Sequence, residues 1–293
     1  MSRMQNTIQS PCRISGRGYW SGQVNTLTFL PAAADTGIRF VRVDLSSRPV
    51  IPAVAESRQG MPLRTRLAAN GAEVDMVEHV MAALFALQID NVEIHCTCAE
   101  MPGLDGSSQP VALALEAAGI RPLDSRREVL QVSEPLCVEG KPGQFLRVEP
   151  ADAPGLTVEY HLDYGPDSII GQSVYRTQVT PTIFLNELAP ARTFITRQEA
   201  DSLQAQGLAR HVTERDLLVF AAHGPENNTL RYPDECARHK ALDLIGDLAL
   251  CGVDLHARVT ARCTGHQLNG LMADKLRSLW RDSAPRTAGR VAA

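Results

Sequence analysis

Hydrophobic and polar residues alternate along several short segments of the chain, which is the pattern of strands with one buried face. The clearest alternation runs through residues 24–30 and 38–45. Further strands are predicted at residues 91–98, 129–138, 144–149, 155–163, 172–178, 217–222 and 253–263. Elsewhere hydrophobic residues recur every three or four positions, which predicts helices. These helices cover residues 74–88, 110–118, 196–208, a segment near 240, and 268–282.

The order of these elements predicts an α+β fold, because strands and helices come in runs rather than in regular alternation. Residues 119–127 contain Gly, Pro and several charged residues, which indicates a linker. We therefore expect domain I at residues 1–124 and domain II at residues 125–282, followed by a flexible tail at residues 283–293. A chain of 293 residues is long enough for two such domains.

Composition excludes some classes of protein and suggests where the chain works. The formal net charge is −4 and only 5% of the residues are aromatic, so nucleic acid is not an expected partner. The seven cysteines are odd in number and scattered, which is typical of a reducing compartment. We see neither a secretory signal nor an apolar stretch of membrane-spanning length. We expect a cytoplasmic protein, which could still take a lipid-bearing substrate from solution or contact a membrane surface transiently.

The predicted helix near residue 240 carries three ionisable residues at intervals of four. His239, Asp243 and Asp247 therefore share one helix face, and the same segment is rich in leucine. Carboxylates on a largely buried helix need a partner, because an unpaired buried charge is costly. A divalent metal is one candidate, and His with Asp suits zinc or iron. The alternative is an ordinary ion pair between His239 and Asp243.

A third ligand and a catalytic base could come from His79 and Glu78, which lie together on another apolar helix. Three protein ligands with an open position make a hydrolytic zinc site. A Glu beside such a site can take a proton from the bound water. The alternative is that Glu78 and His79 both face solvent.

Two further positions could complete such a site. His266 follows Gly265 after a predicted strand, where it could act as a general acid or stabilise charge, with Asp247 orienting it. Thr193 lies in an Ala-Arg-Thr-Phe segment, and its hydroxyl could stabilise an oxyanion. A surface-loop His and an ordinary strand or turn Thr are the alternatives.

Taken together and in this order, the motifs resemble the UDP-3-O-acyl-N-acetylglucosamine deacetylases, the zinc amidases that commit a sugar nucleotide to lipid A synthesis. The resemblance spans nearly the whole chain. Its most specific part is the run Arg-His-Lys-x-x-Asp-x-x-Gly-Asp combined with an upstream Val-Glu-His. The matching segments are residues 77–79, 101–107, 191–194, 238–248 and 265–269.

The resemblance implies a role for each candidate residue. One zinc ion per chain would be held by His79, His239 and Asp243. The reaction would be hydrolysis of an N-acetyl group, giving acetate and a free 2-amine. Glu78 would be the general base, and Thr193 would bind the oxyanion. His266, oriented by Asp247, would stabilise charge or protonate the leaving amine. Phe194 and Lys240 would contact the substrate.

The resemblance also implies a fold of two similar domains, each with helices packed between β-sheets, and an active site between the domains. Domain I would supply Glu78 and His79, and domain II would supply His239, Asp243 and His266. Each domain would carry an insert. The insert of domain II would form a tunnel for the acyl chain of an acylated UDP-amino-sugar substrate.

Several positions depart from the family pattern and bear on the choice of substrate. Trp20 replaces a His, and Cys263 aligns with a usual Lys. Where the family has a Gly-Gly-Ser run, residues 207–213 include Arg210 and His211, which we expect to narrow or reshape the tunnel. These departures leave open an alternative, a zinc amidase acting on another N-acyl sugar with a short or absent lipid. A further alternative is a non-catalytic zinc-binding or regulatory relative, against which the presence of Glu78 and His266 argues, since a structural zinc site needs no base.

Overall fold

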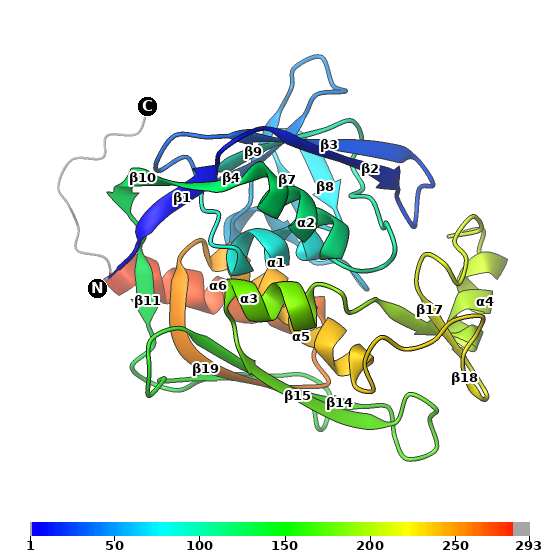
Figure 1. Cartoon of the computed structure of the whole chain (residues 1–293). Helices are drawn as coiled ribbons and strands as arrows, with labels where there is room; N and C mark the ends of the chain where they lie inside the picture. The colour runs from blue at the N-terminus through cyan, green and yellow to red at the C-terminus, as the bar shows by residue number, and fades with distance from the viewer. Residues whose placement is uncertain (1, 284–293) are drawn as a thin grey trace.

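The computed structural model of the chain describes residues 2–283 and arranges them in layers (Figure 1). One β-sheet lies at the top of the view and a second at the bottom, with helices between them. Two of these helices, α1 (Glu78–Ala86) and α5 (Glu235–Leu248), contact each other directly at the centre of the molecule. The predicted α+β fold is confirmed.

The first sheet has five strands in the spatial order β2-β3-β9-β4-β5. Its central strand, β9, pairs antiparallel with β3 and parallel with β4. Inward-facing residues such as Leu27, Phe29 and Ile94 are fully buried in the core. The strands are β2 (Cys12–Arg17), β3 (Val24–Pro31), β4 (Ile38–Arg42), β5 (Val50–Pro52) and β9 (Val92–Cys96).

The second sheet has the same strand order, built from later segments of the chain: β12-β13-β19-β14-β15. Every second residue of β14 and β19 is buried, as the alternating pattern predicted. A further short strand, β11 (Val129–Gln131), pairs parallel with β19. The main strands are β12 (Leu136–Glu139), β13 (Phe145–Glu149), β14 (Leu156–Asp163), β15 (Gln172–Gln178) and β19 (Asp254–Arg262).

Each sheet carries an insert at the same point, between its fourth strand in sequence and the central helix that follows. In both halves the chain then continues from that helix into the middle strand and a last helix, α2 (Gln109–Ala118) or α6 (His266–Ser283). The first insert includes η1 (Ala55–Ser57), β6 (Arg58–Gln59), β7 (Arg66–Ala69) and β8 (Ala72–Asp75). The second includes α3 (Pro181–Ile183), η2 (Phe184–Leu188), β16 (Phe194–Thr196), α4 (Arg197–Ala205), β17 (Leu218–Ala221) and β18 (Gly224–Pro225).

The central helices approach each other closely because α5 has a glycine at the crossing point. A Cβ atom on Gly246 would lie 2.0 Å from the backbone oxygen of Glu78. Only a residue without a side chain fits there unless α1 moves. The contact therefore fixes the first turn of α1 against the C-terminal half of α5.

The predicted linker is wrong. Residues 120–126 form a strand, β10 (Ile120–Arg126), which pairs antiparallel with β1 (Met4–Ile8) near the N-terminus. The proposed domain boundary at residue 124 falls inside β10, and the division into domains stays a prediction.

Two helix boundaries also differ from the prediction. The helix expected from residue 74 begins at Glu78, since Val74 ends up in β8 and Met76 has a positive φ of 60° that interrupts a helix. α6 continues through Ser283, the first residue of the expected flexible tail. The rest of that tail, residues 284–293, lies outside the described part of the chain.

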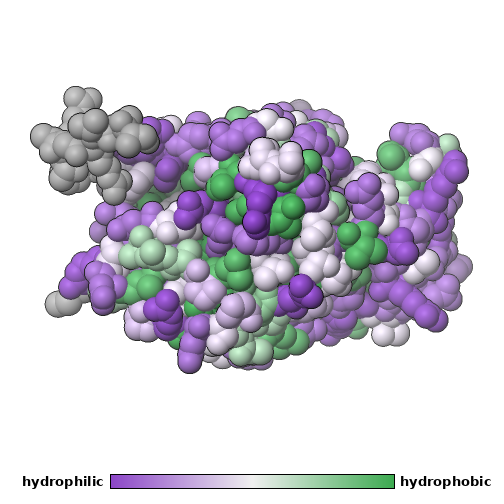
Figure 2. Space-filling view, turned by 90° about the horizontal axis from the view of Figure 1, so that it is seen from above, coloured by the Kyte–Doolittle hydropathy of each residue, from purple (hydrophilic) through white to green (hydrophobic). Residues whose placement is uncertain are grey.

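The surface seen from above in Figure 2 is mostly hydrophilic, with hydrophobic residues in small groups between polar ones. Among the helices described between residues 2 and 283, none is long and apolar enough to cross a membrane.

Candidate functional site

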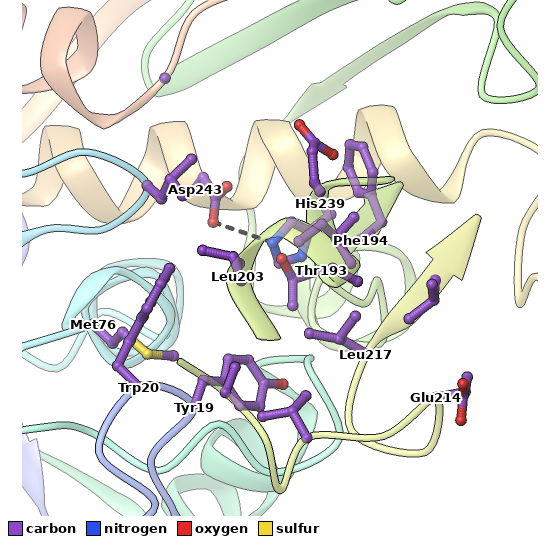
Figure 3. Close-up of a pocket in the computed structure, with 18 of the residues that line it drawn as sticks. Tyr19, Trp20, Met76, Thr193, Phe194, Leu203, Glu214, Leu217, His239 and Asp243 are labelled. Atoms are coloured by element: carbon purple, nitrogen blue, oxygen red, sulfur yellow. Dashed lines mark ion pairs between the residues drawn. The ribbon is translucent and has the colours of Figure 1, made fainter. Parts of the chain in front are cut away.

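Three metal-ligating side chains meet where α1 and α5 face each other. The Nε2 atoms of His239 and His79 lie 3.3 and 3.4 Å from Oδ1 of Asp243. One ligand atom from each residue lies within 4.8 Å of the others. Figure 3 shows His239 and Asp243 side by side at the edge of a pocket. The i, i+4 spacing on α5 therefore places two of the candidate ligands together, and α1 adds the third.

The chemistry of these three side chains fits a metal such as zinc. Oδ1 of Asp243 is buried and has no hydrogen-bond partner among residues 2–283, although two imidazoles face it. His239 donates from Nδ1 to the carbonyl oxygen of Ala191 at 3.1 Å, which leaves its Nε2 lone pair toward Asp243. Two imidazoles and one carboxylate are a usual zinc ligand set.

The protonation states favour the metal site over an ordinary ion pair. Burial lowers the pKa of His239 to about 3, so its imidazole is neutral at pH 7. For Asp243, burial alone would raise the pKa, but the groups around it, among them the cationic Lys240, hold it well below its ordinary value. Lys240 Nζ donates to the other oxygen of Asp243, Oδ2, at 2.8 Å. The site thus presents an ionised carboxylate and neutral imidazole, the forms that bind metal.

Glu78 starts α1 and is buried beside these ligands. Its Oε2 accepts a hydrogen bond from the backbone N–H of Thr65 at 3.0 Å, and its Oε1 lies 3.9 Å from Nε2 of His266. Burial raises the pKa of Glu78 above its ordinary value. A carboxylate with a raised pKa is a better proton acceptor near neutral pH, which suits a general base.

His266 is held by Asp247, one turn beyond Asp243 on α5. Its Nδ1 lies 2.9 Å from Oδ2 of Asp247. Burial would lower the pKa of His266, but the carboxylates of Asp247 and Glu78 outweigh it and raise this pKa to about 9. His266 is therefore a cation at neutral pH and can donate a proton from Nε2. That nitrogen faces Glu78 and Asp243, each at 3.9 Å.

Thr193 and Phe194 approach the site from the second insert. The backbone N–H of Thr193 donates to the carbonyl of Gly106 at 2.8 Å, so a loop of the first half fixes its position. The ring centroids of Phe194 and His239 are 6.4 Å apart, and Lys240 Nζ lies 5.7 Å from the Phe194 ring. All of the candidate site residues except Asp247 line one pocket.

This pocket has a volume of about 440 Å³ and a mainly apolar wall. In Figure 3, Met76, Trp20 and Tyr19 lie on one side and Leu217 and Phe194 on the other. Neither Arg210 nor His211 lines it, contrary to the expected narrowing. The apolar residues of the wall include Tyr19, Trp20, Leu63, Met76, Phe194, Ile195, Leu203, Val212, Leu217 and Val219.

His211 instead joins the second insert to the β2–β3 turn. Its Nε2 donates to the carbonyl of Gly18 at 2.8 Å, and the hydroxyl of Tyr19 donates to the carbonyl of Asp216 at 2.5 Å. These contacts close one wall of the pocket. Trp20, which also departs from the family pattern, lies in that wall. The guanidinium of Arg64 lies 4.6 Å from the centroid of the Trp20 ring.

Sequence reasoning assigned no role to two residues that contact Asp247. Asn269 donates from Nδ2 to Oδ2 of Asp247 at 2.9 Å, and Thr65 donates from Oγ1 to Oδ1 at 2.5 Å. The spacing of Asn269 three positions after His266 on a helix could have indicated a shared face. No sequence signal links Thr65 to Asp247, since 182 positions separate them.

Comparison with known proteins gives a consistent result. The sequence profile described as UDP-3-O-acyl N-acetylglycosamine deacetylase matches residues 5–278. The UDP-3-O-acyl-N-acetylglucosamine deacetylase of Thermosynechococcus vestitus is 42% identical over 92% of this chain and 92% of its own length. The proteins of the same name from Anaeromyxobacter dehalogenans and Syntrophotalea carbinolica are 40% and 34% identical, each over 93% of this chain and 87% of its own length.

Proposed function

Because the chain belongs to the family of UDP-3-O-acyl N-acetylglycosamine deacetylases, and is therefore an amide hydrolase, we propose that it deacetylates UDP-3-O-acyl-N-acetylglucosamine. The products are acetate and UDP-3-O-acyl-glucosamine, an intermediate of lipid A synthesis. The observation that carries this proposal is the convergence of His79, His239 and Asp243 beside Glu78 in an apolar pocket.

We propose that these three side chains hold one zinc ion per chain. Held by these residues, a zinc ion would supply Lewis-acid polarisation of the acetamide carbonyl and would lower the pKa of a water molecule. The orphaned Oδ1 of Asp243 and the neutral imidazole of His239 support this assignment.

The protein side chains supply the proton transfers. Glu78 takes a proton from the attacking water, for which its raised pKa suits it. His266, a cation at neutral pH, gives a proton from Nε2 to the departing amine nitrogen. Asp247 holds the ring of His266 through Nδ1. The hydroxyl of Thr193 donates to the oxyanion as the carbonyl becomes tetrahedral.

Substrate contacts come from both halves of the chain. Phe194 packs on the sugar, and Lys240 contacts sugar or phosphate oxygens while it also holds Asp243. The 3-O-acyl chain occupies the apolar part of the pocket, where burial of its methylene groups stabilises the complex.

A second candidate is a zinc amidase that acts on an N-acyl sugar with a short acyl chain or none. The presence of Trp20 in the pocket wall favours this candidate, since a bulky indole reduces the space for a long chain. A substrate series with decreasing acyl length separates the two. A rate that collapses without the acyl chain supports the lipid A substrate, and an unchanged rate supports the second candidate.

We propose that the enzyme works in the cytoplasm on substrate taken from solution, with at most transient contact with a membrane surface. The odd number and scattered positions of the cysteines, which are typical of a reducing compartment, support this proposal.

Acetate release from the acylated sugar nucleotide by the zinc-loaded protein tests the proposed function. Glu78→Ala should lower kcat by about 10²- to 10⁴-fold with zinc retained, because the base is lost but the ligands remain. Glu116→Ala, a change at an exposed residue of α2, is the control and should keep the full rate. Zinc-loaded wild-type protein that releases no acetate would rule out the substrate assignment.

A further inference from the structure

Thr65, in the first insert, contacts both carboxylates that serve the proton transfers. It precedes β7 and its side chain is buried. Its backbone N–H donates to Oε2 of Glu78 at 3.0 Å, and its hydroxyl donates to Oδ1 of Asp247 at 2.5 Å. Its carbonyl also accepts from the N–H of Val77 at 3.4 Å, immediately before α1. One residue thus connects the start of α1 to the last turns of α5.

The hydroxyl completes the hydrogen bonding of Asp247. This carboxylate is fully buried and accepts at Oδ2 from His266 and Asn269, which leaves Oδ1 to Thr65. Without the hydroxyl, Oδ1 would be a buried charged atom with no donor. The carboxylate would then gain by rotating toward another donor, and Oδ2 would leave the position that holds the ring of His266.

The backbone N–H of Thr65 has a matching effect on Glu78. It occupies Oε2, so Oε1 is the oxygen that faces Nε2 of His266 at 3.9 Å. Catalytic groups act efficiently only when they are held within a fraction of an ångström of the productive geometry. Thr65 is the one residue in the described hydrogen bonds that contacts both Glu78 and Asp247.

We propose that Thr65 is a positioning residue that sets the general base and the general acid relative to each other, and this inference rests on the proposed function. The hydroxyl acts on His266 through Asp247, and the peptide N–H acts on Glu78. Thr65 itself lies outside the pocket wall, so it has no part in binding substrate.

Three variants of the full-length, zinc-loaded enzyme test the proposal. Thr65→Val removes the hydroxyl with little change of shape, and Thr65→Ser keeps it. Thr7→Val is the matched control, because Thr7 is also fully buried and its Oγ1 accepts from the N–H of Ala32 at 3.0 Å, far along the chain from the site. For each variant, kcat, KM, zinc content and the thermal unfolding midpoint are measured.

A second readout does not depend on the substrate. In protein labelled with ¹⁵N-histidine, the Nδ1–H proton of His266 reports its hydrogen bond to Asp247. The resonance is assigned as the one that disappears in His266→Gln.

We expect Thr65→Val to lower kcat by about 10- to 100-fold, the effect of losing a hydrogen bond to a charged group. KM and zinc content should stay near the wild-type values, Thr65→Ser should recover most of the rate, and the His266 resonance should shift. Thr7→Val should keep both kcat and the resonance.

Wild-type kcat and an unmoved resonance in Thr65→Val would overturn the inference. So would an equal loss of kcat in Thr65→Val and Thr7→Val, which would show a role in stability alone. If wild-type protein releases no acetate, the proposed function fails, and the shift of the resonance still decides the inference.

Discussion

Replacing Gly246 by Ala should disable the site by pushing its two helices apart. The added Cβ would lie 2.0 Å from the Glu78 backbone oxygen and 2.8 Å from the carbonyl carbon, whereas ordinary contact begins at 3.4 Å. The backbone of α1 would therefore have to retreat by at least 1.0 Å to reach the shortest distance that real Cβ atoms show, 3.0 Å, and by 1.4 Å to restore ordinary contact at 3.4 Å. No rotamer change can relieve this clash, because the atoms involved belong to the main chain.

The consequence falls on the three proposed metal ligands, because α1 carries His79 and α5 carries His239 and Asp243. Metal sites tolerate deviations of only about 0.2 Å in ligand distance. A retreat of α1 that is several times larger should release His79 and lower zinc affinity. Misplacement by about 1 Å can cost about 100-fold in rate, and overpacking of a core costs about 1–3 kcal/mol of stability.

The assay combines the zinc-to-protein ratio after dialysis, the free energy of unfolding in denaturant, and the rate of acetate release. Gly60→Ala is the control, because a Cβ there meets nothing within 4 Å and the φ of Gly60 lies outside the positive range that disfavours a side chain. We expect Gly246→Ala to lose zinc and to fall at least about 100-fold in kcat. Retention of full zinc content and wild-type kcat would show that α1 adjusts without disturbing the site, and the reasoning would be wrong.

Three further predictions follow from the site. The pKa of His266 is raised to about 9, so His266 stays a proton donor up to about that pH and kcat should fall above it. Asp247→Asn should move this fall in kcat to lower pH. A pH profile that does not move in Asp247→Asn would contradict the role of His266 as the proton donor. Glu235→Ala should cost about 3–5 kcal/mol in denaturant unfolding, since it leaves the buried Arg192 without its partner at 2.8 Å; a cost below about 1 kcal/mol would refute this. Leu203→Trp should fill part of the pocket and raise KM for long-chain substrates more than for short-chain ones; an equal effect on both would place the acyl chain elsewhere.

The sequence predicted those parts of the site that depend on a single element. His239 and Asp243 lie four apart on one helix, so the helical period alone placed them on one face. The partnership of these residues with His79 came from the resemblance, because the sequence pattern did not show which helices pack together. Thr65 was missed for the same reason, since only the tertiary fold brings it to Asp247.

The errors in the fold also have physical causes. Residues 120–126 follow a glycine and include charged residues and a proline, which are typical of a linker. They form a strand because β1, near the N-terminus, supplies hydrogen-bond partners that the local sequence does not reveal. The pattern of hydrophobic residues around Val74 continues into α1, so the sequence pattern predicted one helix. In the structure, the positive φ of Met76 separates the strand β8 from the helix α1. The side chain of His211 does not narrow the pocket, because its imidazole donates to the backbone carbonyl of Gly18, but this contact helps to shape one wall.

The repeated strand order has a consequence for how this enzyme can change over time. In both halves the insert interrupts the repeated order of strands and helices at the same point, just before the central helix, α1 or α5, that holds the candidate metal ligands. The inserts and the β2–β3 turn supply most of the pocket wall, whereas the central helices supply the ligands. Mutations that reshape the apolar wall, which we propose binds the acyl chain, can therefore accumulate without disturbing the crossing at Gly246. The three candidate metal ligands lie on the central helices and most of the pocket wall lies on the inserts, so insert positions other than Thr65 and Thr193 can change while the ligands are kept.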